Sequence, residues 1–469
     1  MMPDEIKDEP ASPQADIGGD INEKIKVEEE DESPPITEDP IVPKEEDQEE
    51  NGKEKEKEDD RVQDVDKEIK ELKLDTLRAL CDAKQRDEIA ALALSKHGLV
   101  NDEMRKRCWP ILLGYDPSVI KTELEDAKVK LENDKVILQD YLGRVPYTEL
   151  PPHRDEEQVA LDVNRSFVYY PSGLTSEEMD AQKQELHDLI VEVLRRHPIL
   201  CYFQGFHDIC QVILLVLGPK LAPLAVEYMA LLRIRDFMLP ALGPALWHLK
   251  LLHPILFAAD EKLCRHLSTT QPFFALAATL TLYAHDIQAY GDIARLFDAF
   301  LAESPIFPVY FFATIVMSRR DELFDIPDTE PEMLHSILCK LPKPLDLEGL
   351  ISKAIDLQSS HPPHTLRIWS KIPTSSVLKT YRSPLRSGGS VIKKNVKRDL
   401  LRGEALFKKQ ASQLSREQFK TQVMTNFQTH KTMIGWTVLA GVSAVALGYY
   451  LGKRGLDTKS VWQALAVNF

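Results

Sequence analysis

The chain has 469 residues, 43% of them hydrophobic, which is enough to bury one large core and leave extensions outside it. Its formal net charge is −16, but residues 1–60 alone hold 24 Asp/Glu against 7 Lys/Arg, so nearly all of the negative excess lies in this segment. The rest of the chain is close to neutral and lacks the large positive charge typical of nucleic-acid-binding proteins. Nucleic acid is therefore not an expected partner.

The N-terminal segment is rich in Pro, Glu, Asp and Lys and poor in aromatic residues. Such a composition does not bury enough apolar surface to offset the entropy that is lost on folding. Residues 1–66 are therefore predicted to be a disordered acidic tail.

Six cysteines are scattered through apolar surroundings, and no two of them form a Cys-x-x-Cys pair. The acidic first residues do not resemble a signal peptide. We therefore expect a reducing, cytosolic environment for the main domain, with the cysteines as small buried apolar side chains and no metal site. The cysteines are Cys81, Cys108, Cys201, Cys210, Cys264 and Cys339.

Across residues 67–372, apolar residues recur with the period of an α-helix, and Pro or Gly separates the runs. The alternation that is typical of β-strands does not occur in this sequence. We therefore predict one all-helical domain over residues 67–372, and the fold class is all-α.

Two helices of this domain have clear limits. The first follows Thr175, which forms a capping-box pattern with Glu178, and stops before Pro198. The second follows Gly205 and ends at Gly218. Its last turns are apolar on every side, which predicts a position in the centre of the core.

The C-terminal part of the chain has the pattern of a membrane anchor. Residues 371–431 hold 14 Lys/Arg and 3 Asp/Glu, and we predict a basic juxtamembrane linker over 373–431. Residues 433–452 contain no charged residue and have the length of a single transmembrane helix, although a buried core helix is the alternative. The basic excess before this stretch predicts a cytosolic main domain and a short lumenal tail at 453–469.

Two short motifs lie about forty residues apart in the helical domain. Residues 159–165 read Val-Ala-Leu-Asp-Val-Asn-Arg, and residues 202–205 read Tyr-Phe-Gln-Gly. They resemble the IxxDxxR and YxQG motifs of TBC-domain Rab GTPase-activating proteins. Val159 stands where the family usually has Ile, a difference that concerns packing and not the polar groups.

Further landmarks of that family occur in the same order. Arg105-x-x-x-Trp109 lies near the start of the domain, and Arg295-Leu-Phe-Asp298 resembles a later RxWD-type motif. The resemblance covers about residues 90–350, and the expected C-terminal anchor is similar to that of membrane-bound members of the family. It implies a multi-helix TBC domain.

The resemblance implies that Arg165 is an arginine finger and that Gln204 is a glutamine finger. GTP hydrolysis develops negative charge on phosphoryl oxygens, which a permanently charged guanidinium stabilises. The reaction also needs an oriented water, and an amide can both donate to and accept from one. Both groups would be supplied in trans, so the chain would activate a GTPase and would not itself be an enzyme.

The remaining motif residues are expected to support these two. Asp162 would orient Arg165, while Tyr202 and Gly205 would support Gln204. Four further residues are predicted to be scaffold, and the two on one helix, three positions apart, are close enough to pair. These four are Arg105, Trp109, Arg295 and Asp298.

Two alternatives come from other classes of protein. His-Asp dipeptides at 187–188, 207–208 and 285–286 are similar to those of helical, metal-dependent HD-superfamily phosphohydrolases. A TBC module can also be an inactive scaffold that binds a Rab, although the presence of both Arg165 and Gln204 argues against this.

The resemblance also implies a binding partner and a cellular location. The partner is a GTP-bound Rab-family GTPase, which brings GTP and Mg²⁺, so the chain needs no cofactor of its own. The implied location is an endomembrane, the endoplasmic reticulum, with a single-pass anchor and a cytosolic TBC domain. The implied process is ER-to-Golgi vesicle transport.

Overall fold

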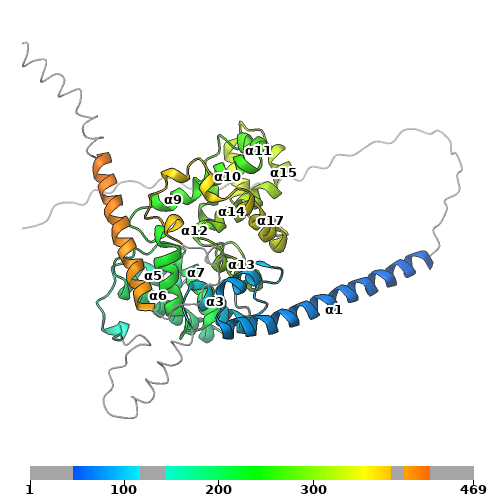
Figure 1. Ribbon diagram of the computed structural model, residues 1–469, viewed down its shortest axis with the longest axis horizontal. Helices are drawn as coiled ribbons and strands as arrows, with labels where there is room; N and C mark the ends of the chain where they lie inside the picture. Colours follow the sequence, from blue (N-terminus) through cyan, green and yellow to red (C-terminus); the bar gives the residue numbers. More distant parts are fainter. Residues whose placement is uncertain (1–45, 117–143, 382–395, 423–469) are drawn as a thin grey trace, which may run out of the picture. The chain divides into compact units, whose positions relative to one another are not determined.

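The computed structural model describes residues 46–116, 144–381 and 396–422 (Figure 1). The chain divides into a unit at 1–63 and a second unit at 64–469, and helix α1 crosses the boundary between them. Every regular element in the described ranges is a helix, which confirms the predicted all-helical fold.

The first half of the described chain carries the helices that hold both sequence motifs. In chain order these are α1 (Glu46–Ala83), α2 (Arg86–Leu94), α3 (Asp102–Leu113), η1 (Tyr147–Glu149), α5 (Glu156–Val163), α6 (Ser176–Arg196), α7 (Phe206–Leu217), α8 (Ala222–Tyr228), η2 (Met229–Arg233) and η3 (Arg235–Phe237).

The second half continues with short helices and ends on a long one. These are α9 (Gly243–Leu249), α10 (Leu252–Ala259), α11 (Glu261–His266), η4 (Pro272–Ala275), α12 (Leu276–Leu280), α13 (Tyr290–Ala302), α14 (Phe307–Ser318), α15 (Arg320–Phe324), α16 (Pro331–Leu338), α17 (Leu347–Ser360), η5 (Pro363–Thr365), η6 (Trp369–Lys371), α18 (Val377–Thr380) and a helix over residues 396–422.

Helix α1 starts at Glu46, inside the segment predicted to be a disordered tail. Its sequence alternates Glu and Lys, residues with good helix propensity that pair at a spacing of four. An acidic and a basic residue also pair at this spacing nearer the end of the helix, with Lys70 Nζ 3.0 Å from Asp66 Oδ2. From Asp64 onward the helix belongs to the second unit, where Leu77 is fully buried. The predicted tail at 1–45 lies outside the described residues.

The two helices with clear sequence limits form as predicted. Helix α6 begins after Thr175, whose hydroxyl accepts from the Glu178 backbone while the Glu178 carboxylate accepts in return. Helix α7 runs between Gly205 and Gly218 and is buried along nearly its whole length. It packs against α3, α5, α6 and α8, so the residues just before α7 are attached to the centre of the core.

Two of the four predicted scaffold residues, Arg105 and Trp109, contact the buried carboxylate of a third, Asp298. Asp298 on α13 is fully buried and accepts from Arg105 Nε at 3.1 Å, from Trp109 Nε1 at 2.8 Å and from the Leu99 backbone N–H at 3.0 Å. Trp109 is itself fully buried and stacks on Phe297 with ring centroids 6.0 Å apart. These contacts join α3 and the residues just before it to α13.

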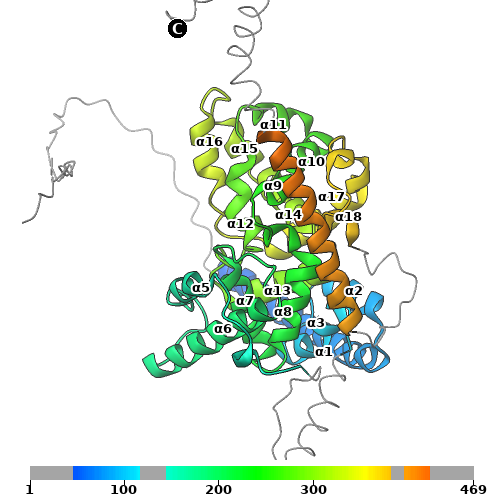
Figure 2. The same ribbon diagram turned by 90° about the vertical axis from the view of Figure 1, so that its left-hand side faces the viewer.

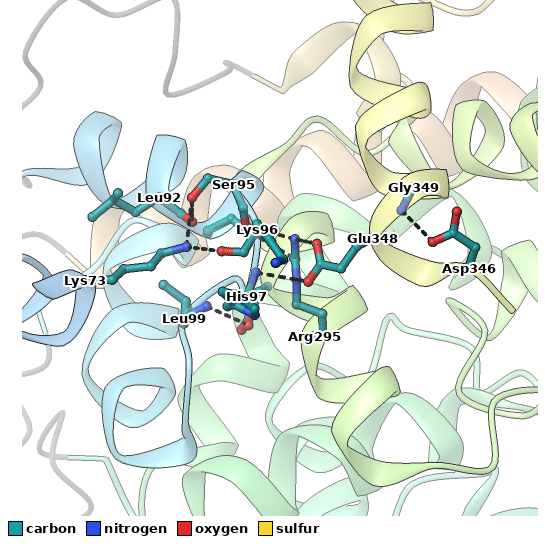
Figure 3. Close-up of polar contacts among 12 residues, drawn as sticks. Lys73, Leu92, Ser95, Lys96, His97, Leu99, Arg295, Asp346, Glu348 and Gly349 are labelled. Carbon is teal, nitrogen blue, oxygen red and sulfur yellow. Dashed lines mark hydrogen bonds and ion pairs between the residues drawn. The ribbon is translucent and has the colours of Figure 1, made fainter. Parts of the chain in front are cut away.

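The predicted pairing of Arg295 with Asp298 is wrong. Arg295 donates instead to Glu348 of α17, with both Nε and Nη2 at 2.8 Å from its carboxylate oxygens, and to the Ala93 carbonyl at 3.0 Å (Figure 3). Spacing along one helix showed only that the two side chains were within reach of each other. The tertiary fold provides a separate partner for each.

The loop between α2 and α3 lies beside Lys73 and the Arg295–Glu348 ion pair (Figure 3). Lys73 of α1 donates to Ser95 Oγ at 2.8 Å and to the Lys96 carbonyl at 2.7 Å. Burial lowers the pKa of Lys73 to about 8. Gly98 has a φ of +52°, and a Cβ there would lie 2.6 Å from Asp298 Oδ2, so only glycine fits this approach.

The C-terminal segment predicted as a basic linker contains a helix over residues 396–422 that is attached to the domain. Val396, Leu400 and Phe407 are buried. Figure 2 shows this helix, in orange, running along one side of the domain. No helix within the described residues is both long and apolar enough to span a bilayer. The predicted span at 433–452 and the predicted lumenal tail lie outside them.

Candidate functional site

A cleft of about 500 Å³ opens where three segments meet. They are residues 165–170 after α5, the turn and first residues of α7 at 204–211, and the stretch at 276–285. Arg165 and Gln204 both line this cleft, although the sequence separates them by 39 positions. The structure therefore brings the two predicted finger residues together.

Arg165 lies just past the end of α5, with its side chain 60% exposed. One guanidinium nitrogen contacts the carboxylate of Asp162, which is fully buried three residues earlier. A guanidinium has five N–H donors, so this single contact orients the group and leaves other donors facing the cleft. The geometry agrees with the expected role of Asp162.

Asp162 is itself held by two donors. Gln158 Nε2 donates to one carboxylate oxygen at 3.0 Å, and the Tyr202 hydroxyl donates to the other at 2.9 Å. Burial, with Asp162 as a neighbour, raises the pKa of Tyr202, so the hydroxyl keeps its proton and remains a donor. Tyr202 therefore connects the Gln204 segment to the carboxylate that holds Arg165.

Gln204 occupies the turn that leads into α7, and its side chain is exposed. The next residue, Gly205, has a φ of +103°, a conformation that favours glycine. A Cβ at this position would lie 2.6 Å from Thr281 Cγ2. The turn is therefore fixed by close packing, while the amide of Gln204 projects from it.

Replacing Gly205 by Ala is expected to reduce the free energy of unfolding by about 1–3 kcal/mol, through the positive φ and the contact with Thr281. Gly291→Ala is the matched control, since its Cβ would meet nothing within 4 Å and its φ is ordinary. Chemical denaturation of both variants measures the difference. Equal stability of the two variants would contradict the close packing of this turn.

Two of the three His-Asp dipeptides meet at the cleft. His207 Nε2 lies 3.3 Å from Asp208 Oδ1, and His285 Nδ1 lies 3.5 Å from Asp208 Oδ2. His207 Nδ1 is also 3.1 Å from the Tyr202 hydroxyl. Burial lowers the pKa of His207 and raises that of Asp208. The third dipeptide, at 187–188, lies on α6 and does not line the cleft.

Within the part of the chain that the structure describes, no group of three or more His, Cys, Asp or Glu side chains is arranged to hold a metal ion. The HD-superfamily interpretation needs such a set of ligands.

One supporting residue was missed by the sequence analysis. Gln211 on α7 is buried; its Oε1 accepts from the Phe167 backbone at 3.1 Å, and its Nε2 donates to the Tyr170 carbonyl at 3.2 Å. It thereby holds the loop that follows Arg165 against α7. The only signal in the sequence was one amide in an otherwise apolar stretch of helix.

Part of the chain is similar to a known domain family and to named proteins. The family model of the Rab-GTPase-TBC domain matches residues 102–324. Bovine "TBC1 domain family member 20" is 34% identical over 284 residues, which cover 60% of this chain and 65% of that protein. The "GTPase-activating protein gyp10" of Schizosaccharomyces pombe is 29% identical over 388 residues, which cover 81% of this chain and 95% of that protein.

Among solved structures, the Ypt/Rab-GAP domain of Gyp1p aligns with 62% of this chain and 98% of its own, at a TM-score of 0.49 and 14% identity. The chain spans a little under two thirds of the length of the bovine relative. The matched region, residues 102–324, contains Arg165 and Gln204, the two predicted finger residues, together with Asp162 and Asp298. Residues 102–324, a little under half of the chain, are thus similar to the Rab-GTPase-TBC domain.

Proposed function

We propose that the chain is a GTPase-activating protein for a Rab-family GTPase, and that it acts through an arginine finger, Arg165, and a glutamine finger, Gln204. The observation that carries this proposal is that both side chains are exposed and line one cleft. Each is attached to the core by a buried neighbour, Asp162 for the first and Gly205 for the second. Such rigid support is what transition-state stabilisation requires.

In the proposed reaction the Rab brings GTP and Mg²⁺, and the chain adds groups of its own. Arg165 donates to the phosphoryl oxygens as negative charge develops on them. Gln204 orients the attacking water through its amide. The contact with Asp162 limits the rotamers of Arg165, so less side-chain entropy is lost when the transition state forms. The chain changes no bond of its own and needs no resident cofactor.

The names of the relatives support the same class of activity. The fission yeast protein is named as a GTPase-activating protein and aligns with most of this chain. The bovine protein is named only by its TBC domain. We extend the activity from the first of these to this chain on the strength of the two exposed finger residues.

We further propose that residues 433–452 anchor the chain in an endomembrane, the endoplasmic reticulum, with the TBC domain in the cytosol. The support is the uncharged stretch of twenty residues and the basic segment before it. Anchoring next to a membrane-bound GTPase raises the effective concentration of the pair. The proposed substrates are Rabs of the ER-to-Golgi step.

The second candidate is an inactive TBC scaffold that binds Rab without accelerating hydrolysis. Single-turnover GTP hydrolysis by a panel of purified Rabs, with and without the full-length chain in mild detergent, separates the two. Acceleration of one Rab subgroup supports the proposed activity and identifies the substrate. Binding without acceleration of any Rab would favour the scaffold.

A further inference from the structure

The helix over residues 396–422 has one face that is fixed to the domain. Gly403 lies so close to η2 that a Cβ would be 2.8 Å from Leu231 Cβ. Gln410 Nε2 donates to Asp236 Oδ1 at 2.7 Å, and its Oε1 accepts from Arg235 Nε at 3.1 Å. His197 Nδ1 lies 2.8 Å from Glu404 Oε1. These contacts set the rotation of the helix about its axis, so the opposite face has a fixed direction.

The opposite face is basic. At 3.6 residues per turn its exposed basic residues fall within an arc of about 140° that includes no Asp or Glu. The acidic residues of the helix lie outside this arc. Asp399 lies 3.8 Å from Arg398, Glu404 lies between His197 and Lys408, and Glu417 is exposed. The exposed basic residues of this face are Lys397, Arg398, Arg402, Lys408, Lys409, Arg416 and Lys420.

Two large apolar side chains lie among these charges. Leu401 is 57% exposed and Phe419 is 67% exposed. They are 18 residues apart, which is five full turns, so they point in the same direction. A solvated charged face does not need exposed apolar side chains at its centre. A helix that lies on a lipid surface does, because apolar groups enter the acyl boundary while basic groups contact anionic headgroups.

We propose that this face of the helix, defined by its seven basic residues with Leu401 and Phe419, binds the surface of an anionic lipid bilayer. The occupant is indicated by charge complementarity, by the two apolar side chains, and by the uncharged stretch that begins at residue 433 of the sequence. Since the inner face is fixed to the domain, this contact orients the Arg165 cleft with respect to the membrane. The proposal concerns lipid binding and does not depend on GTPase activation.

The test uses the full-length chain with Arg402→Glu, Lys409→Glu and Arg416→Glu combined. Co-sedimentation is measured with vesicles of phosphatidylcholine alone and with vesicles that also contain phosphatidylserine. The wild-type chain is expected to bind the anionic vesicles more tightly than the neutral ones. In the triple variant this gain in affinity is expected to be smaller by about 100-fold or more. Raised salt is expected to abolish the preference of the wild type for anionic vesicles.

A control variant carries the same charge change at three exposed lysines outside the helix, Lys106, Lys340 and Lys353. This control variant is expected to retain the preference for anionic vesicles. The rate of Rab GTP hydrolysis in detergent solution is expected to be equal in all three proteins, which separates this proposal from the proposed activity. Thermal unfolding checks that the exposed substitutions leave the fold intact.

Two results would overturn the proposal. The first is that the wild type shows no preference for anionic vesicles, and the second is that both triple variants lose the preference equally.

Discussion

Arg165→Ala is expected to reduce the acceleration of Rab GTP hydrolysis by about 10³- to 10⁵-fold, the range associated with arginine fingers that act in trans. The physical reason is that the guanidinium stabilises charge that develops only in the transition state. Affinity for a Rab bound to a GTP analogue is expected to change much less. Single-turnover kinetics and an equilibrium binding measurement provide the two values.

The structure offers a matched control for this experiment. Arg154 has a side chain 59% exposed, almost the same as the 60% of Arg165, but it does not line the cleft. Arg154→Ala is expected to retain nearly full activity. Arg165→Lys is expected to lose most of it, because an ammonium keeps the charge but not the planar set of donors. A loss of binding as large as the loss of rate would contradict the finger assignment.

Asp298→Ala is expected to reduce the free energy of unfolding by about 3–5 kcal/mol, the cost of leaving a buried ionic partner without its counter-charge. The substitution leaves the Arg105 guanidinium, the Trp109 indole N–H and the Leu99 backbone N–H without their common acceptor. Arg105 keeps a contact with Asp102 at 2.8 Å, which limits the loss.

Chemical denaturation measures this effect against a control on the same helix. Asp292 lies in the first turn of α13 and is exposed, so Asp292→Asn is expected to change the unfolding free energy by less than about 1 kcal/mol. A double-mutant cycle of Arg105→Met with Asp298→Ala gives the coupling between the two side chains. Additive effects of the two substitutions would show that the ion pair contributes nothing to the scaffold.

Local sequence signals located the elements that carry the site. The capping box at Thr175 and the glycines at 205 and 218 define α6 and α7, because helix ends depend on a few nearby residues. The long apolar run predicted that α7 is central, since a helix that is apolar all round has to be buried. The two finger residues were identified by resemblance, and their exposure at one cleft is consistent with it.

Side-chain pairs between distant segments could not be predicted from local signals of this kind. Arg295 and Asp298 were within reach of each other on one helix, yet Arg295 pairs with Glu348 and Asp298 with Arg105. Gln211 showed no motif, although it holds the loop after Arg165. Each of these pairings depends on which side chain of a distant segment lies within hydrogen-bonding distance in the folded chain.

The sequence by itself determined the helical class and the limits of its clearest helices, because periodicity and capping are local properties. The two predicted finger residues came from the resemblance of short motifs to those of a known family. Only the tertiary structure decided that Tyr202 joins the two motifs and that the helix at 396–422 packs on the domain with its basic face outward. These features depend on contacts between residues far apart in the chain. Such contacts form only when burial of the shared core brings the segments together.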